Sequence, residues 1–264
     1  MREVLTMWRD TRMIMLTAVV AAVYAAVLIP FKGLTIIPGF TSVRPANVFP
    51  IIFSLLFGPA AAWGSAIGNL IGDIFGGTFG PASFFGFIGN FFFGFVRYKL
   101  WGNLGPLSSG EEPDFRSNTG RQLLEYLVVA LVGATITAAI IAWGVDLLGL
   151  VPFPVLGVTI TVNNFIAAAI LGPPLLYLTW PRVKELGLLY PEILRDDDLS
   201  DVASSRRQTA AYGIAVVAIV WVFVGIFIAS PQSTFQRALG AIGFILVLGF
   251  AIISGERLSK LVEY

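Results

Sequence analysis

The sequence predicts an all-α integral membrane protein with about eight transmembrane helices. Of its 264 residues, 56% are hydrophobic and 12% are charged, which is about half the charged share of a soluble domain. The mean hydropathy is +0.83, and the apolar residues form long runs separated by Pro, Gly or charged residues. A soluble fold of this length could not bury so much apolar surface, whereas a lipid bilayer takes the place of a core.

The apolar runs set the expected helices. Crossing about 30 Å of hydrocarbon takes about 20 residues, so the short runs over 46–57 and 60–76 either extend further or lie in the protein interior. The first run follows several arginines, as in a signal peptide, but it is long enough to span and more spans follow. We expect helices over 13–30, 46–57, 60–76, 83–101, 122–143, 155–179, 209–229 and 236–254.

The basic residues predict the orientation. With the N-terminus inside, only Lys32, Arg44 and Arg237 lie outside, which leaves 14 of the 17 Lys and Arg on the inner side. Cytoplasmic loops carry such an excess. Both termini are therefore expected in the cytoplasm, after an even number of spans.

A charged stretch divides the chain into parts. We expect a six-helix body over 1–180, a cytoplasmic linker over 181–208 and a two-helix transmembrane hairpin over 209–264. The linker holds the run Asp196–Asp198, for which a solvated charge run is favoured over a calcium site because calcium ligands converge from alternating positions. The hairpin has few polar side chains within its spans and is expected to pack against the body.

Composition also excludes classes of function. The chain has no Cys and no His, which rules out disulfides, Cys/His zinc sites and imidazole acid–base catalysis. No carboxylate pair or Ser/Lys dyad is evident in the membrane. We expect no enzyme, no metal and no cofactor, and the net charge of +1 does not suggest nucleic acid.

Polar side chains gather toward the outer ends of the body's helices. Such residues are costly in a membrane, so their positions suggest function. They predict a solute cavity that opens outward, in which an arginine pairs an anion, asparagines meet a heterocycle edge and an aromatic ring stacks. For Asp73 the alternative is an ion pair with Arg44 and no ligand. The candidate binding residues are Arg44, Asn47, Asn69, Asp73, Asn90, Trp143 and Asn164.

Small residues repeat every four positions in two helices. Ala18, Ala22 and Ala26 form a face that serves either internal packing or docking of a partner membrane protein. The repeat Gly64, Gly68, Gly72 and Gly76 is interpreted as helix packing. The loop over 30–45 carries exposed apolar residues (Leu34, Ile36, Ile37), which suggests a lid hinged at Gly33 and Gly39.

These features resemble the substrate-binding S component of energy-coupling factor (ECF) transporters. The resemblance covers about residues 10–180 and rests on the alanine face, the long first outer loop, the block from Arg44-Pro45 to Gly72-Asp73, and Asn163-Asn164 followed by Leu171-Gly172-Pro173. It implies a prokaryotic cell-membrane protein that binds a vitamin or related metabolite near the outer face. It also implies a transmembrane coupling protein, docked at Ala18 and Ala22, and two ATPase subunits.

The chain departs from that family in its C-terminal hairpin, and it has no GxxxxGK[ST] motif with which to hydrolyse ATP itself. Flavin, pterin, deazapurine and pyrimidine solutes all fit the polar set. A self-sufficient secondary transporter and a non-transporting cell-envelope protein remain as alternatives.

Overall fold

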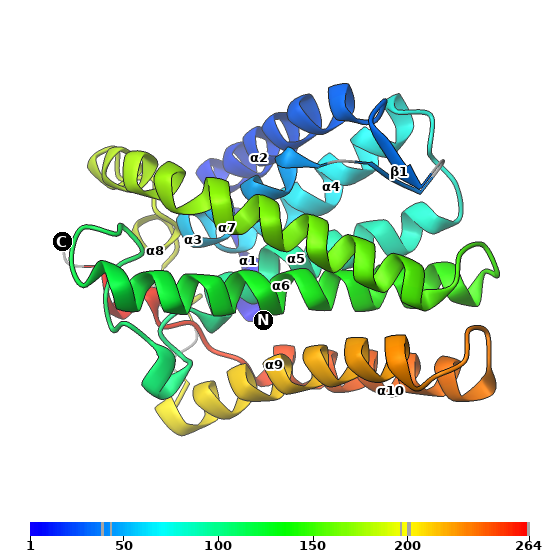
Figure 1. Ribbon diagram of the computed structural model, residues 1–264. Coiled ribbons are helices and arrows are strands. Elements are labelled where there is room, and N and C mark those ends of the chain that lie inside the picture. The colour runs from blue at the N-terminus through cyan, green and yellow to red at the C-terminus, as the bar shows by residue number, and fades with distance from the viewer. Residues whose placement is uncertain (38–39, 43, 196, 200–201, 263–264) are drawn as a thin grey trace.

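The computed structural model describes residues 1–264 except 38–39, 43, 196, 200–201 and 263–264. The described chain is almost entirely helical (Figure 1), which confirms the all-α membrane fold. The elements are α1 (Arg2–Thr6), α2 (Thr11–Phe31), β1 (Thr35–Ile37), β2 (Thr41–Ser42), α3 (Phe49–Phe57), α4 (Pro59–Phe75), α5 (Ala82–Leu100), α6 (Thr119–Leu147), α7 (Phe153–Glu185), α8 (Tyr190–Ile193), α9 (Ser204–Phe227) and α10 (Thr234–Ile253).

Each expected apolar segment corresponds to one helix. Among the described residues, the stretches that contain α2, α6, α7, α9 and α10 are long and apolar enough to cross a membrane. α3 has only nine residues and ends at Gly58, whose φ of 50° places it in the left-handed region, and Pro59 starts α4. The total of eight spans therefore stays a prediction.

The segment between α7 and α9 is shorter than the expected linker over 181–208. α7 runs to Glu185 and α9 begins at Ser204, so helix occupies both ends of 181–208. α7 continues through Pro173, Pro174 and Pro181, because neighbouring groups in a membrane bundle can satisfy the backbone that proline frees. Of the predicted Asp run, Asp196 lies outside the described residues.

α2 and α4 pack at very short range. A Cβ added to Gly64 would lie 2.5 Å from Val20, and one added to Gly68 would lie 2.8 Å from the Ala21 carbonyl oxygen. The glycine repeat of α4 is thus a packing surface for α2. The opposite side of α2 is exposed, and it carries Ala18, Ala22 and Ala26. Within the described chain, this alanine face does not serve internal packing.

The C-terminal hairpin of α9 and α10 lies along α6 (Figure 1). Trp143 of α6 contacts Trp221 of α9 and Phe244 of α10, with ring centroids 6.0 and 6.2 Å apart. At the C-terminal end of α6, Asp146 accepts hydrogen bonds from the backbone N–H groups of Phe153 and Gln232, at 3.0 and 2.9 Å. One carboxylate therefore ties the α6–α7 turn to the hairpin loop.

Polar contacts also close the opposite end of the bundle. Lys99 at the end of α5 forms an ion pair of 2.6 Å with Glu3 of α1, and Tyr98 donates to the same carboxylate. Arg207 of α9 donates to Asn103 at 3.3 Å. Lys99, one of the basic residues predicted on the inner side, is thus buried by its pairing with Glu3 of α1.

Gly68→Ala should weaken the body. The new Cβ meets the backbone of α2 rather than a flexible side chain, so the helices must separate, at a cost of about 1–3 kcal/mol. Thermal unfolding of the purified protein in detergent measures this loss. Gly249→Ala in α10 is the control, because its Cβ meets no described atom within 4 Å and alanine favours helix. Equal melting temperatures for both variants would contradict the close packing.

Candidate functional site

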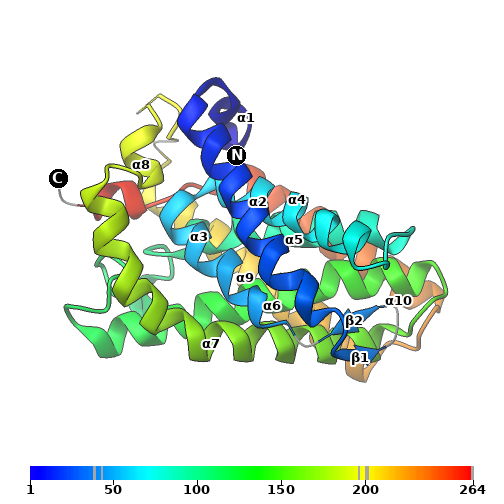
Figure 2. The same cartoon turned by 90° about the horizontal axis from the view of Figure 1, so that it is seen from above.

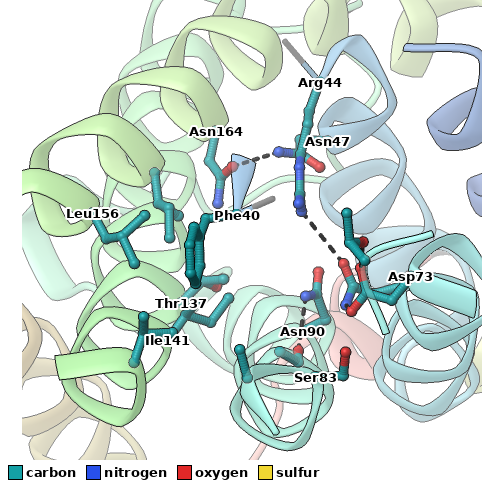
Figure 3. A pocket seen from close by; sticks show the side chains of 16 residues that line it. Phe40, Arg44, Asn47, Asp73, Ser83, Asn90, Thr137, Ile141, Leu156 and Asn164 are labelled. Carbon is teal, nitrogen blue, oxygen red and sulfur yellow. Dashed lines mark hydrogen bonds between the residues drawn. The ribbon is translucent and has the colours of Figure 1, made fainter. Parts of the chain in front are cut away.

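A cavity lies at one end of the body, between the loop that follows α2 and the helices α4, α5, α6 and α7 (Figure 3). It measures about 640 Å³ including its open mouth. This volume is an upper bound, and it limits the occupant to a single small molecule.

One side of the cavity is polar and the other apolar. The polar side contains six of the seven predicted binding residues, namely Arg44, Asn47, Asn69, Asp73, Asn90 and Asn164. The apolar side consists of Ile141 and Val145 of α6 and Leu156 and Ile160 of α7. Binding sites for small molecules combine apolar walls with a few placed polar groups in this way. That the six residues bind solute stays a prediction.

Hydrogen bonds hold the asparagines on the polar side. Asn47 donates through Nδ2 to Oδ1 of Asn164, and Asn90 donates to the Gly86 carbonyl at 2.8 Å. The Tyr24 hydroxyl lies 2.8 Å from Asn47 Oδ1 and 3.1 Å from Asn90 Oδ1. Tyr24 is fully buried behind the polar side of the cavity, and its hydroxyl holds the side-chain amides of Asn47 and Asn90 in position. The sequence analysis missed it because it lies in an apolar run.

The ion-pair partner of Asp73 is Lys32 and not Arg44, which corrects the alternative considered above. Lys32 Nζ lies 2.7 Å from Asp73 Oδ1 and 2.8 Å from Thr78 Oγ1. The side chains of the pair are only 9% and 10% exposed. Packing of α2 on α4 brings the C-terminal end of α2 beside Asp73, and this geometry decides the partner. Lys32 was one of the three basic residues predicted on the outer side, so its charge could have indicated it as a partner of Asp73.

Arg44, Asn69 and Asp73 form a hydrogen-bonded polar row. Arg44 Nη1 donates to Asn69 Oδ1 at 3.4 Å, and Asn69 donates in turn to Asp73 at 3.3 Å. Arg44 Nε is buried and has no hydrogen-bond acceptor among the described residues. The row therefore runs from a cationic donor through an amide to a carboxylate acceptor, with donor capacity left on the arginine.

Trp143 was predicted to bind solute, but it does not line the cavity. It packs against the hairpin, as described above. Ile141 and Val145 lie two positions on either side of it and face the cavity, and a helix turns about 200° over two residues. Phe40 supplies an aromatic ring instead, from the loop (Figure 3).

The predicted lid loop forms a small antiparallel hairpin. Thr35 pairs with Ser42 and Ile37 with Thr41, and Phe40 lies in the connection. Leu34 and Ile36 are exposed, as expected for residues without a cover. The predicted hinge Gly39 lies outside the described residues. The loop thus carries an aromatic side chain to the cavity, and its closure stays a prediction.

Arg97 of α5 is a further buried polar residue, which the sequence analysis counted only among the basic residues of the inner side. It is fully buried, and its Cζ lies 3.7 Å from the centroid of the Phe93 ring. Its three guanidinium nitrogens have no hydrogen-bond acceptor among the described residues. On α5 it lies two turns from Asn90, so a buried positive charge sits on the inner side of the cavity.

One protein family matches this chain over most of the six-helix body. The family model described as QueT transporter matches residues 14–180, which is more than half of the chain. The match begins in α2, ends in α7 and includes every residue that lines the cavity, whereas α9 and α10 lie outside it. Searches of curated proteins and of solved structures found no match.

The matched family confirms the resemblance drawn from the alanine face, the outer loop and the Arg44–Asp73 block, and it indicates a transporter rather than an enzyme. The chain belongs to the QueT transporter family and is a substrate-binding S component of an ECF transporter.

Proposed function

We propose that this protein captures a queuosine precursor or a related deazapurine at the outer face of a prokaryotic cell membrane and delivers it inward. The observation that carries the proposal is the cavity within the family-matched body, where six polar side chains converge on one side. Family membership supports a queuosine precursor among the solutes that the polar set fits.

The polar row suits the edge of a deazapurine that carries a carbonyl next to N–H groups. Arg44 donates, and Asp73 accepts, with the two-way amide of Asn69 between them. A solute carbonyl would take the free donor capacity of Arg44. The N–H groups beside it would donate to Asp73, while the apolar side and Phe40 cover the ring faces.

The cavity end of the bundle is the one predicted to face outward. Lys32, Arg44 and the loop hairpin lie there, whereas α1 and most basic residues lie at the other end. An outward-open site with both termini in the cytoplasm follows from that distribution. The apolar residues Leu34 and Ile36 would be covered when the loop closes over bound solute.

Transport energy comes from partner subunits in this proposal. The chain has no ATP-binding motif of the GxxxxGK[ST] type. A transmembrane coupling protein with two ATPase subunits would dock on the exposed alanine face of α2. Small residues allow close helix approach, and close approach drives association in lipid.

Asp73→Ala and Asn164→Ala should each weaken solute binding by more than tenfold, about 1.4 kcal/mol or more, because each removes a polar contact from a buried side chain that lines the cavity. Titration of the purified protein with a 7-deazaguanine, by calorimetry, measures the affinity. Thr159→Ala is the control on α7, since Thr159 does not line the cavity and its hydroxyl donates to the Val155 carbonyl of its own helix. Unchanged affinity in both cavity variants would move the site elsewhere.

Ala22→Trp should abolish uptake in cells and leave solute binding intact. The indole projects from the exposed side of α2, so the body keeps its packing while a docked helix is pushed away. Uptake of labelled solute and binding to the purified variant are measured side by side. Val216→Trp, on the exposed side of α9, is the matched control and should preserve both.

Two outcomes would contradict the docking face. Loss of binding together with folding would mean that the alanines serve internal packing. Normal uptake by Ala22→Trp would mean that the protein transports alone or docks through another face.

A further inference from the structure

A second pocket lies far from the solute cavity, where the segment between α5 and α6 meets the C-terminal end of α7. It measures about 550 Å³ including its opening. Two guanidinium groups face one carboxylate there, so its charge is positive. The lining residues are Arg116, Tyr177, Leu178, Pro181, Arg182 and Glu185.

Fixed contacts shape this pocket. Glu112 of the connecting segment accepts hydrogen bonds from Trp180 Nε1 at 2.7 Å and from Lys184 Nζ at 2.6 Å. Trp180 is almost fully buried. The segment is therefore held against α7, and Arg116 is carried to the rim of the pocket.

The arginines of the pocket are available to an anion. Arg116 has its Cζ 5.1 Å from the centroid of the Tyr177 ring, and no described carboxylate lies within ion-pair distance of it. Arg182 pairs with Glu185 at 3.3 Å, but these side chains are 79% and 67% exposed. Exposed pairs of this kind stabilise a protein little, so an incoming phosphate can compete for Arg182.

The length and charge of α7 suit a position of the pocket at the depth of lipid headgroups. α7 has 33 residues, or about 50 Å at about 1.5 Å per residue, against about 30 Å of hydrocarbon. A helix of this length extends beyond the hydrocarbon, and its last turn carries Arg182 and Lys184. Tyrosine and arginine are typical residues at this level.

An apolar stripe leads along α7 to the pocket. Val162, Ile166, Ile170 and Leu178 are exposed at spacings of four or eight residues, so they follow a stripe that winds slowly around the helix toward the pocket. α7 runs along the edge of the molecule (Figure 2). Acyl chains can lie on this stripe while a headgroup reaches the pocket.

We propose that this pocket binds the phosphate of an anionic phospholipid. The forked guanidinium groups of Arg116 and Arg182 match phosphate oxygens, and the Tyr177 ring packs beside the headgroup. A lipid is favoured over free phosphate because the pocket opens beside the apolar stripe. The site is independent of the solute cavity and of the proposed solute.

Native mass spectrometry of the full-length protein tests the proposal, with phosphatidylglycerol and phosphatidylcholine of equal chain length as probes. Phosphatidylglycerol should bind at least tenfold more tightly. Arg116→Gln together with Arg182→Gln should remove that preference, with melting temperature in lipid-free detergent and solute affinity unchanged. Arg206→Gln, an exposed arginine of α9 outside the pocket, is the matched control and should keep the preference.

Three results would overturn the proposal. Equal binding of the two lipids means that the pocket does not distinguish an anionic headgroup from a zwitterionic one. An equal loss in Arg206→Gln means that overall surface charge, and not the pocket, holds the lipid. Inorganic phosphate that displaces phosphatidylglycerol at equal concentration means that the site takes a free anion.

Discussion

The close packing of α2 against α4 determines the geometry of the site. Glycines on α4 let the two backbones approach to a distance that no side chain would allow, as at Gly64 and Gly68. That approach sets the height and rotation of α2. Tyr24 then reaches the asparagines of the cavity, Lys32 reaches Asp73, and the alanine face is turned outward. The side chains that contact the cavity's polar residues and the exposed alanine face thus lie on two sides of one helix.

On the other side of the cavity, α6 also has two contact surfaces, one toward the cavity and one toward the hairpin. Its Thr137, Ile141 and Val145 line the cavity, and Trp143 is covered by the hairpin. Asp146 joins the α6–α7 turn to the hairpin loop through two backbone donors. The hairpin lies outside the family match. It packs against α6, which lines the cavity, and contributes no lining residue of its own.

The charges in the body are placed where stability alone would not favour them. A buried ion pair such as Lys32–Asp73 contributes little net stability, because desolvation offsets the attraction. Arg97 is buried beside the Phe93 ring with no described acceptor for its nitrogens. Ionisable groups retained at such cost in a membrane protein are typical of solute pathways.

The sequence by itself determined the membrane class, the helices to within a few residues and six of the seven residues that meet in the cavity. These follow from hydropathy and from the cost of polar groups in lipid, which act on each segment alone. Tertiary structure alone decided that Lys32 rather than Arg44 pairs with Asp73, that Trp143 meets the hairpin, that Tyr24 contacts two asparagines of the cavity and that Phe40 lines it. Those outcomes depend on the rotation of each helix against its neighbours and on the reach of long side chains, and spacing along one chain does not encode either quantity.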